Sequence, residues 1–255
     1  MTASPRDRTY RIANWLFARV FWALGIRFDV RGADNIPASG SAILAANHIG
    51  FLDFALVGYA AREQKRFVRF MTKRSIFDVW IVGRFMRAMR HIPVTRTSGA
   101  TAYRQARRSL DDGQIVGVFP EATISRSFEL KPFRPGAAGL AISRKAPIIP
   151  VITWGGHRVW TVDGRRSLKR GKTVMISAGA PLWAREGESI DELTQRLMAA
   201  MAHLLTDVLD DYPGIPREGE DTWWIPHSRG GTAPDAETAA GLDREALARI
   251  GESID

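Results

Sequence analysis

The chain has 255 residues, of which 45% are hydrophobic and 25% charged, and it contains no cysteine. A chain of this length and apolar content can bury a substantial core, so a wholly disordered protein is excluded. The lack of cysteine excludes disulfides, thiolate metal sites, iron–sulfur clusters and a cysteine nucleophile. No stretch reaches 18 uncharged apolar residues, so a conventional membrane-spanning helix is not expected.

Charge is distributed unevenly along the chain. Residues 1–180 hold 30 Lys and Arg against 11 Asp and Glu, a net charge of +19. Residues 181–255 hold 6 against 16, a net charge of −10, which leaves +9 for the whole chain. A basic body predicts an anionic partner, and lipid headgroups, nucleic acid and phosphorylated metabolites are all candidates.

The first predicted element is an amphipathic helix over residues 8–25. At about 100° per residue, one arc is apolar, while arginines and two tryptophans, Trp15 and Trp22, lie on the other. This pattern is typical of a helix lying in a bilayer interface, and we expect it to bind an anionic membrane surface. An amphipathic helix packed on the protein's own core is the alternative. The apolar arc consists of Ile12, Ala13, Leu16, Phe17, Val20, Phe21 and Leu24.

Strand-like and helical runs alternate after the first helix. Most of the predicted strands are apolar throughout rather than alternating between apolar and polar residues, and helices lie between them. This pattern predicts a largely parallel sheet covered on both faces, and hence a single α/β domain over residues 26–212. The predicted strands are residues 26–31, 42–46, 66–71, 91–94, 115–119, 148–153 and 172–178. The predicted helices are residues 51–62, 75–90, 99–112, 135–145 and 189–210.

The composition changes at Pro213. Residues 213–255 are acidic and rich in Pro and Gly, which predicts a surface-hugging or mobile tail with a short helix at 241–250. Paired tryptophans are unusual in a free linker, so we expect Trp223 and Trp224 to dock onto the domain rather than contact a membrane. The sequence thus predicts three parts, residues 1–25, 26–212 and 213–255.

His48 follows the predicted strand 42–46, and Asp53 lies one turn into the next helix. Ligands of α/β folds bind where strands end, so a site is expected at this edge. With His48 in the loop before the helix, Asp53 can fold back to its ring. A carboxylate on one imidazole nitrogen fixes the tautomer and makes the other nitrogen a better base. A loop histidine followed by a helix-capping aspartate is the alternative interpretation.

Two further segments place polar side chains after short strands. Arg96 ends the run HIPVTR, which would deliver it to the same edge of the sheet. After the strand at 115–119, hydroxyl groups and cations follow one another closely, and these are the groups that bind a phosphate monoester. A solvated arginine and a charged surface loop are the respective alternatives. The second segment contributes Glu121, Thr123, Arg126, Lys131 and Arg134.

Several common catalytic motifs are absent. The sequence holds no G-x-S-x-G, no H-E-x-x-H and no G-x-G-x-x-G. Residues 164–173 (GRRSLKRGKT) have six spacers where a P-loop needs four, and they run into a predicted strand, so we reject a P-loop. Without an activated serine or cysteine, any group transfer is expected to be direct.

Four blocks in this order resemble the glycerolipid acyltransferases of the 1-acylglycerol-3-phosphate O-acyltransferase type. Asn47-His48 to Asp53 looks like the family's N-H-x-x-x-x-D, and Pro93 to Arg96 is similar to its P-V-x-R segment. Residues 119–123 (FPEAT) are similar to F-P-E-G-T, and the proline-bracketed strand at 146–151 is similar to the fourth block. The resemblance covers residues 26–180 and leaves the tail outside.

The resemblance implies that His48 is the general base and Asp53 its orienting partner. Ala122 departs from the family's Gly, and Ile124 stands where the family has Arg, with Arg126 two positions further on as a substitute. Lys131 and Arg134 are similar to basic residues often found before the following glycine. The residues expected to bind substrate are Asn47, Arg96, Glu121, Thr123, Arg126, Lys131 and Arg134.

The implied reaction moves a fatty acyl group from acyl-CoA or acyl carrier protein to the free hydroxyl of 1-acylglycerol-3-phosphate. No metal ion or cofactor is expected, and the protein is expected at the cytoplasmic face of the cell membrane as a peripheral protein. The missing arginine of the third block leaves another lysophospholipid or a glycosylated lipid open as the acceptor.

Two other classes of protein remain to be weighed. A nucleic-acid-binding protein would explain the basic body, but the aromatic residues cluster in the first helix and the tail, and no recognition motif appears, so no nucleic-acid partner is expected. A metal hydrolase would need more ligands than His48 and Asp53.

Overall fold

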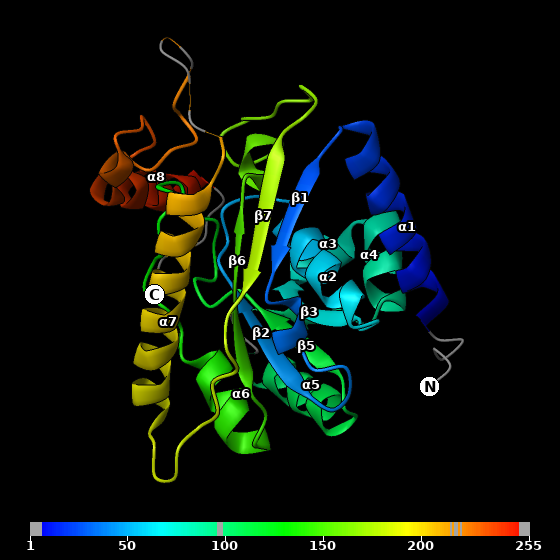
Figure 1. Ribbon diagram of the computed structural model, residues 1–255. Coiled ribbons are helices and arrows are strands. Elements are labelled where there is room, and N and C mark those ends of the chain that lie inside the picture. The colour runs from blue at the N-terminus through cyan, green and yellow to red at the C-terminus, as the bar shows by residue number, and fades with distance from the viewer. Residues whose placement is uncertain (1–6, 96–98, 215, 217–218, 220, 250–255) are drawn as a thin grey trace.

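The computed structural model describes residues 7–95, 99–214, 216, 219 and 221–249. A central sheet of seven strands runs in the order β1-β7-β6-β2-β5-β3-β4 (Figure 1). Neighbouring strands are parallel except β6 and β7, which are antiparallel. The predicted α/β fold with a mostly parallel sheet is therefore confirmed. The strands are β1 (Arg27–Arg31), β2 (Ala42–Ala46), β3 (Val68–Lys73), β4 (Ile92–Val94), β5 (Ile115–Val118), β6 (Ile148–Trp154) and β7 (Thr173–Ala178).

Helices cover both faces of this sheet. Successive strand residues point to opposite faces, so Ile43 and Ala45 of β2 pack with α5, α6 and α7, while Leu44 packs with α1 and α2. All five residues of β2 are buried, which explains the unalternated sequence AILAA. The helices are α1 (Arg8–Ala23), α2 (Asp53–Glu63), α3 (Arg74–Asp78), α4 (Trp80–Ala88), α5 (Gly99–Asp111), α6 (Gly136–Arg144), α7 (Ile190–Asp211) and α8 (Ala236–Arg249).

The single helix predicted over residues 75–90 is wrong, because the segment forms two helices, α3 and α4. Val79 between them is extended, with φ −73° and ψ 114°. The chain then turns back so closely that a Cβ on Gly83 would lie 1.9 Å from the carbonyl oxygen of Phe77. The hydrophobic pattern alone does not show this close approach, which a side chain at position 83 would prevent.

Helix α1 is attached to the domain by one side only. Tyr10, Ala13 and Phe21 are buried, and the Tyr10 hydroxyl donates a 2.8 Å hydrogen bond to the carbonyl oxygen of Val68. Ile12, on the predicted apolar arc, is nevertheless 47% exposed. The helix thus packs on the protein's own core while a second apolar strip faces outward. Within the described part of the chain, no helix has both the length and the apolar character needed to cross a membrane.

The tail packs on the domain through Trp224, which is 6% exposed. The Arg158 guanidinium lies 4.0 Å from the centre of the Trp224 ring, and the Trp224 carbonyl oxygen lies 3.0 Å from His157 Nε2. The predicted docking of the tryptophan pair is confirmed. The helix predicted at 241–250 begins earlier, at Ala236.

Candidate active site

Parallel pairing brings two of the predicted segments together. Strands β2 and β5 are neighbours with the same direction, so the residues after Ala46 and after Val118 leave the sheet at the same edge. The His48 ring stacks on Phe119, with ring centres 4.3 Å apart and planes 20° from parallel. His48 therefore lies at the edge of the sheet where the sequence predicted a site.

The predicted approach of Asp53 to the His48 ring is confirmed. Nδ1 of His48 and Oδ2 of Asp53 are 3.0 Å apart. The same oxygen accepts the backbone N–H groups of Ile49 at 2.7 Å and Gly50 at 2.8 Å. Asp53 is fully buried and caps no helix by its side chain, so the alternative of a helix-capping aspartate is wrong. These contacts fix the orientation of the Asp53 carboxyl group against the loop that carries His48.

This arrangement leaves one ring nitrogen of His48 available. A carboxylate at Nδ1 favours the tautomer that carries its proton there, so Nε2 holds the lone pair. The side chain is 22% exposed, and Nε2 has no hydrogen-bond partner among the described residues. A substrate hydroxyl that reaches Nε2 would find a positioned base.

Asn47 holds β2 to β6 beside this pair. Its Nδ2 donates to the carbonyl oxygen of Thr153 at 3.1 Å, and its Oδ1 accepts the Thr153 N–H at 2.8 Å. The side chain is 1% exposed. Substrate binding by Asn47 stays a prediction, while the structure shows a side chain that fixes the strand before His48. Thr153 was missed in the sequence because this contact spans 106 positions.

Glu121 is buried and ties two loops together. Oε1 accepts the backbone N–H of His48 at 2.9 Å, and Oε2 accepts that of Lys131 at 3.1 Å. Burial raises the pKa of this carboxyl to about 8, against the opposing effect of the two hydrogen bonds. Substrate binding by Glu121 stays a prediction. The alternative of an ordinary charged surface loop does not fit a carboxyl that is 5% exposed.

The cations of the third block meet an acidic residue of the tail. Lys131 Nζ donates to the Thr123 hydroxyl and lies 2.9 Å from Oδ2 of Asp243. Arg126 pairs with the other oxygen of Asp243 and, at 3.1 Å, with Asp163. Asp243 belongs to α8, and its only signal in the sequence was the acidic character of the tail. The predicted phosphate-binding groups are thus assembled, but they are already paired with carboxylates of the chain.

Two predicted residues remain, Arg134 and Arg96. The Arg134 backbone N–H donates to the carbonyl oxygen of Pro120 at 2.8 Å, and the residue is exposed. Arg96 lies outside the described residues, and only its preceding strand β4 is placed, at the end of the sheet next to β3. Binding of substrate by both residues stays a prediction.

An exposed aromatic pair on the loop after His48 was also missed in the sequence. Phe51 is 40% exposed and Trp160 is 48% exposed, and their ring centres lie 4.8 Å apart. The Phe51 N–H donates to the carbonyl oxygen of Trp160 at 3.2 Å. This contact joins the loop after His48 to a segment more than one hundred residues away, and it gives that loop an exposed apolar surface.

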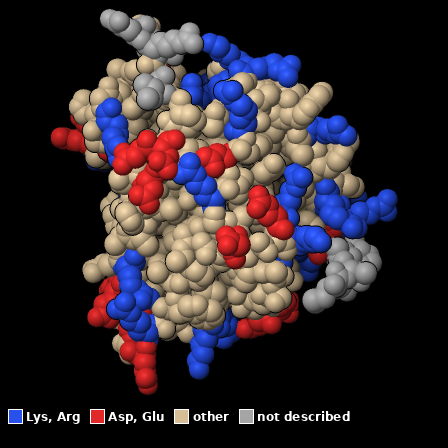
Figure 2. Space-filling model, viewed as in Figure 1, with Lys and Arg blue, Asp and Glu red and all other residues tan. Residues whose placement is uncertain are grey.

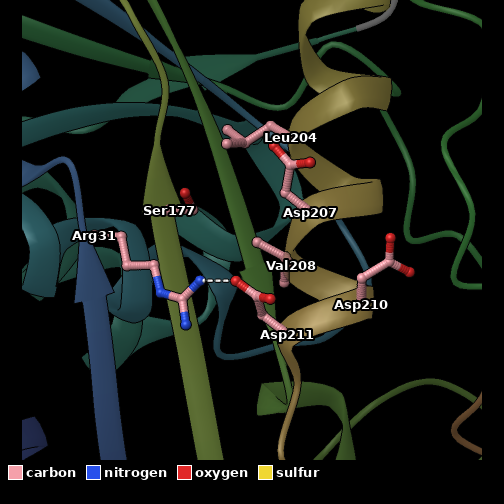
Figure 3. A pocket seen from close by; sticks show the side chains of 7 residues that line it. All are labelled: Arg31, Ser177, Leu204, Asp207, Val208, Asp210 and Asp211. Carbon is pink, nitrogen blue, oxygen red and sulfur yellow. Dashed lines mark hydrogen bonds and ion pairs between the residues drawn. The ribbon is translucent and has the colours of Figure 1, made fainter.

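A separate pocket of about 450 Å³ lies between β1, β7 and α7 (Figure 3). Arg31 pairs with Asp211 across it, and none of the predicted site residues lines it. Three aspartates in its wall make it unsuitable for an anionic ligand. Neither here nor anywhere else in the described residues could a group of three or more His, Asp and Glu side chains hold a metal ion. The pocket lining is Arg31, Ser177, Leu204, Asp207, Val208, Asp210 and Asp211.

Known proteins share this chain's sequence pattern and fold. The family model described as Acyltransferase matches residues 27–154, which contain all four blocks. A 1-acyl-sn-glycerol-3-phosphate acyltransferase of Bacillus subtilis is 29% identical over 167 residues, covering 63% of this chain and 79% of that protein. A protein of the same description from Borreliella burgdorferi is 30% identical over 193 residues, covering 74% of this chain and 71% of its own.

A solved structure supports the fold. The 1-acyl-sn-glycerophosphate acyltransferase of Thermotoga maritima superposes with a TM-score of 0.64 at 20% sequence identity. The match covers 82% of this chain and 84% of that one.

Proposed function

This chain belongs to the Acyltransferase family, and from that premise we propose that it transfers a fatty acyl group to the free hydroxyl of 1-acylglycerol-3-phosphate. The hydrogen bond between His48 Nδ1 and Asp53 Oδ2 carries the proposal, because it leaves Nε2 as a base at the edge of the sheet. The relatives described as acylating this acceptor support the choice of substrate.

His48 performs the proton transfer in the proposed reaction. An alcohol is a weak nucleophile until its proton is removed, and His48 Nε2 accepts that proton while the oxygen attacks the thioester carbonyl. The new C–O bond forms, the C–S bond breaks, and the proton on His48 passes to the departing thiolate. Asp53 stabilises the transient imidazolium. A positioned general base contributes about 10²–10⁴-fold to such a rate.

The acyl donor in this proposal is acyl-CoA or acyl carrier protein. The exposed Phe51–Trp160 pair supports it, since the two rings give a fatty chain an apolar surface beside the loop that carries His48. The proposed reaction uses neither a metal ion nor a cofactor, because His48 and Asp53 supply the acid–base chemistry.

The phosphate of the acceptor is proposed to bind Thr123, Arg126 and Lys131, with Arg96 from the second block. Binding the phosphate would place the acceptor hydroxyl against His48, so these residues act mainly by orientation. The ion pairs of Arg126 and Lys131 with Asp243 favour a second candidate. Cations that are already neutralised suit a different lysophospholipid or a glycosylated lipid as the acceptor.

The proposed enzyme works as a peripheral protein at the cytoplasmic face of the cell membrane. Its substrates reside there, and the outward strip of α1 supports this location, with Trp15 56% and Trp22 73% exposed. The guanidinium of Arg19 lies 5.2 Å from the centre of the Trp15 ring, so apolar and cationic groups share the same side of the helix.

The test of the proposal is His48→Ala, assayed with acyl-CoA and a panel of lysolipid acceptors. We expect kcat to fall at least about 10²-fold while the melting temperature stays close to the wild-type value. The matched control is His203→Ala, which removes an exposed histidine that lies 3.8 Å from Asp207 on α7. Equal activity of the two variants would contradict the proposal, and the acceptor that is used best decides between the two candidates.

A further inference from the structure

Exposed apolar side chains are concentrated on two neighbouring parts of the molecule. Of the seventeen large hydrophobic residues that are exposed in the described part of the chain, five belong to α1 and six to the segment of α3 and α4. Trp80 is 78% exposed and Ile81 58%. A soluble surface rarely keeps such a patch uncovered. The six residues of the second segment are Ile76, Val79, Trp80, Ile81, Val82 and Phe85.

The two parts form one surface. Met86 of α4 packs in the same cluster as Tyr10 and Ala13 of α1. The inward sides of both helices are thereby held together, and α4 lies beside α1 (Figure 1). We call the exposed side chains of α1, α3 and α4 the lipid face.

The lipid face is strongly basic. Residues 7–23 and 73–90 together hold eight Lys and Arg against two Asp. Asp7 is buried against Arg69, and Asp78 pairs with Arg74 at 3.4 Å. Lys and Arg predominate on the side of the molecule on which α1 lies, whereas acidic side chains lie over the middle and the opposite side of this view, where they are mixed with Lys and Arg (Figure 2). A second copy of this chain would bring two basic surfaces together, so the charge favours an anionic partner.

A pocket of about 330 Å³ opens between these helices and the strand of the second block. Arg74 and Arg87 line it, and Arg87 is held in place by a 3.0 Å hydrogen bond to the carbonyl oxygen of Phe77. A small pocket lined by two arginines suits a phosphate group. The other lining residues are Phe77, His91, Pro93 and Gln105.

We propose that the lipid face binds an anionic bilayer, with Trp80, Ile81 and Phe85 inserted among the lipids and a headgroup phosphate in the pocket of Arg74 and Arg87. Apolar side chains surrounded by arginines are what an interfacial protein surface requires. This inference rests on the proposed function for its biological sense, but the binding can be measured without any acyl transfer. It adds the apolar side chains of α3 and α4 to a membrane contact that the sequence assigned to the first helix and to the basic charge of the body.

The apolar part is tested by sedimentation of the full-length protein with vesicles of phosphatidylcholine alone or mixed with phosphatidylglycerol. The double variant Trp80→Ser with Ile81→Ser is expected to bind the mixed vesicles at least about tenfold more weakly. The matched control is Trp183→Ser, since Trp183 is 55% exposed and lies outside the lipid face. Equal binding by the double variant and this control would overturn the proposal. So would size-exclusion chromatography that shows a wild-type dimer lost in the double variant.

The headgroup pocket is tested by Arg87→Gln against Arg84→Gln. Both variants remove one exposed arginine of α4, but only Arg87 lines the pocket. A larger loss of phosphatidylglycerol dependence for Arg87→Gln supports the pocket, and equal losses would overturn it in favour of diffuse charge. Circular dichroism of Arg87→Gln checks that α4 stays folded without the bond to Phe77.

Acyl transfer to a short-chain, water-soluble acceptor separates this inference from the proposed function. We expect the double variant to keep wild-type activity there, because the substrate does not need the bilayer. A wild-type protein that binds vesicles but acylates no lysolipid would contradict the proposed function. The same result would support membrane binding by the lipid face.

Discussion

Asp243 of α8 lies 2.9 Å from the ammonium nitrogen of Lys131, although 112 positions separate the two residues. Its second carboxylate oxygen pairs with Arg126. The carboxylate therefore occupies the space between two cations that the third block supplies. An acceptor phosphate that binds the same cations must compete with it.

The first prediction concerns this competition. Asp243→Asn keeps the shape of the side chain and removes its charge, so Arg126 and Lys131 become available to a phosphate. We expect the KM for 1-acylglycerol-3-phosphate to fall about three- to tenfold, with kcat unchanged, since one ion pair of this kind is worth about 1 kcal/mol. Steady-state kinetics with varied acceptor concentration measure the effect.

Asp210→Asn is the control for Asp243→Asn, because it breaks another ion pair of the C-terminal region, the one with Arg229. That variant should leave the KM unchanged. If Asp243→Asn also leaves it unchanged, Arg126 and Lys131 serve to hold α8 and do not bind the acceptor.

The second prediction concerns Ala122, whose φ of +64° lies in the left-handed region. This conformation costs an L-residue other than glycine about 1–2 kcal/mol, while glycine adds about 0.4–1 kcal/mol of unfolded-state entropy. Ala122→Gly should therefore raise the free energy of unfolding by about 0.5–1 kcal/mol, as measured by urea denaturation. Ala199→Gly, on an exposed site of α7, should instead lower it by about 1 kcal/mol. A loss of stability in Ala122→Gly would show that the loop carries no such strain.

The third prediction concerns pH and His157, which is fully buried. Burial lowers its pKa from 6.5 to about 3. Between pH 6.5 and pH 3, His157 therefore binds a proton in the unfolded chain but not in the folded chain. The stability contributed by neutral His157 is complete above pH 6.5 and is lost as the pH falls toward 3. His157→Gln cannot titrate and can still donate to the Trp224 carbonyl. Its free energy of unfolding should fall less steeply on acidification, by up to about 1.4 kcal/mol per pH unit.

Denaturation with urea at a series of pH values measures the two slopes. His91, whose pKa burial also lowers to about 3, contributes to both proteins. Glu121, whose pKa burial raises to about 8, contributes a slope of opposite sign to both. These contributions cancel in the comparison. Identical slopes for wild type and His157→Gln would contradict the burial of a neutral histidine at this position.

Local patterns were enough to predict the central strand and the contact of His48 with Asp53. Strand β2 was predicted at the bounds observed, because all five of its residues are apolar and buried. The contact of His48 with Asp53 spans five positions, so the spacing in the sequence already limited where the carboxylate could reach. Such features depend on neighbours along the chain, which the sequence displays directly.

Features that depend on distant neighbours could not be predicted in this way. The break at Val79 follows from the approach of Gly83 to the Phe77 backbone, and periodicity continues through it. The pairing of Asp243 with Lys131 joins the tail to the third block, which lie far apart in the sequence. Only folding brings these groups together, so no sequence motif indicates that they are in contact.

The fourth prediction concerns Asn47, whose amide donates to the carbonyl oxygen of Thr153 at 3.1 Å. Asn47→Asp replaces this donor by a buried, charged acceptor of the same shape, which faces another acceptor. We expect the free energy of unfolding to fall by about 2–4 kcal/mol, since the lost bond and the desolvated charge add up. We also expect kcat to fall about tenfold or more at temperatures where the variant is folded, because β2 positions His48 through this contact.

Asn35→Asp provides the matched control for Asn47→Asp. Asn35 Nδ2 donates to the carbonyl oxygen of Ala178 at 2.9 Å, so the same exchange of donor for acceptor occurs away from His48. Asn35→Asp should lower the melting temperature but keep the kcat of the folded fraction. A misplaced base would slow every turnover. If Asn47→Asp also loses stability but keeps its kcat, then Asn47 supports the fold without positioning His48.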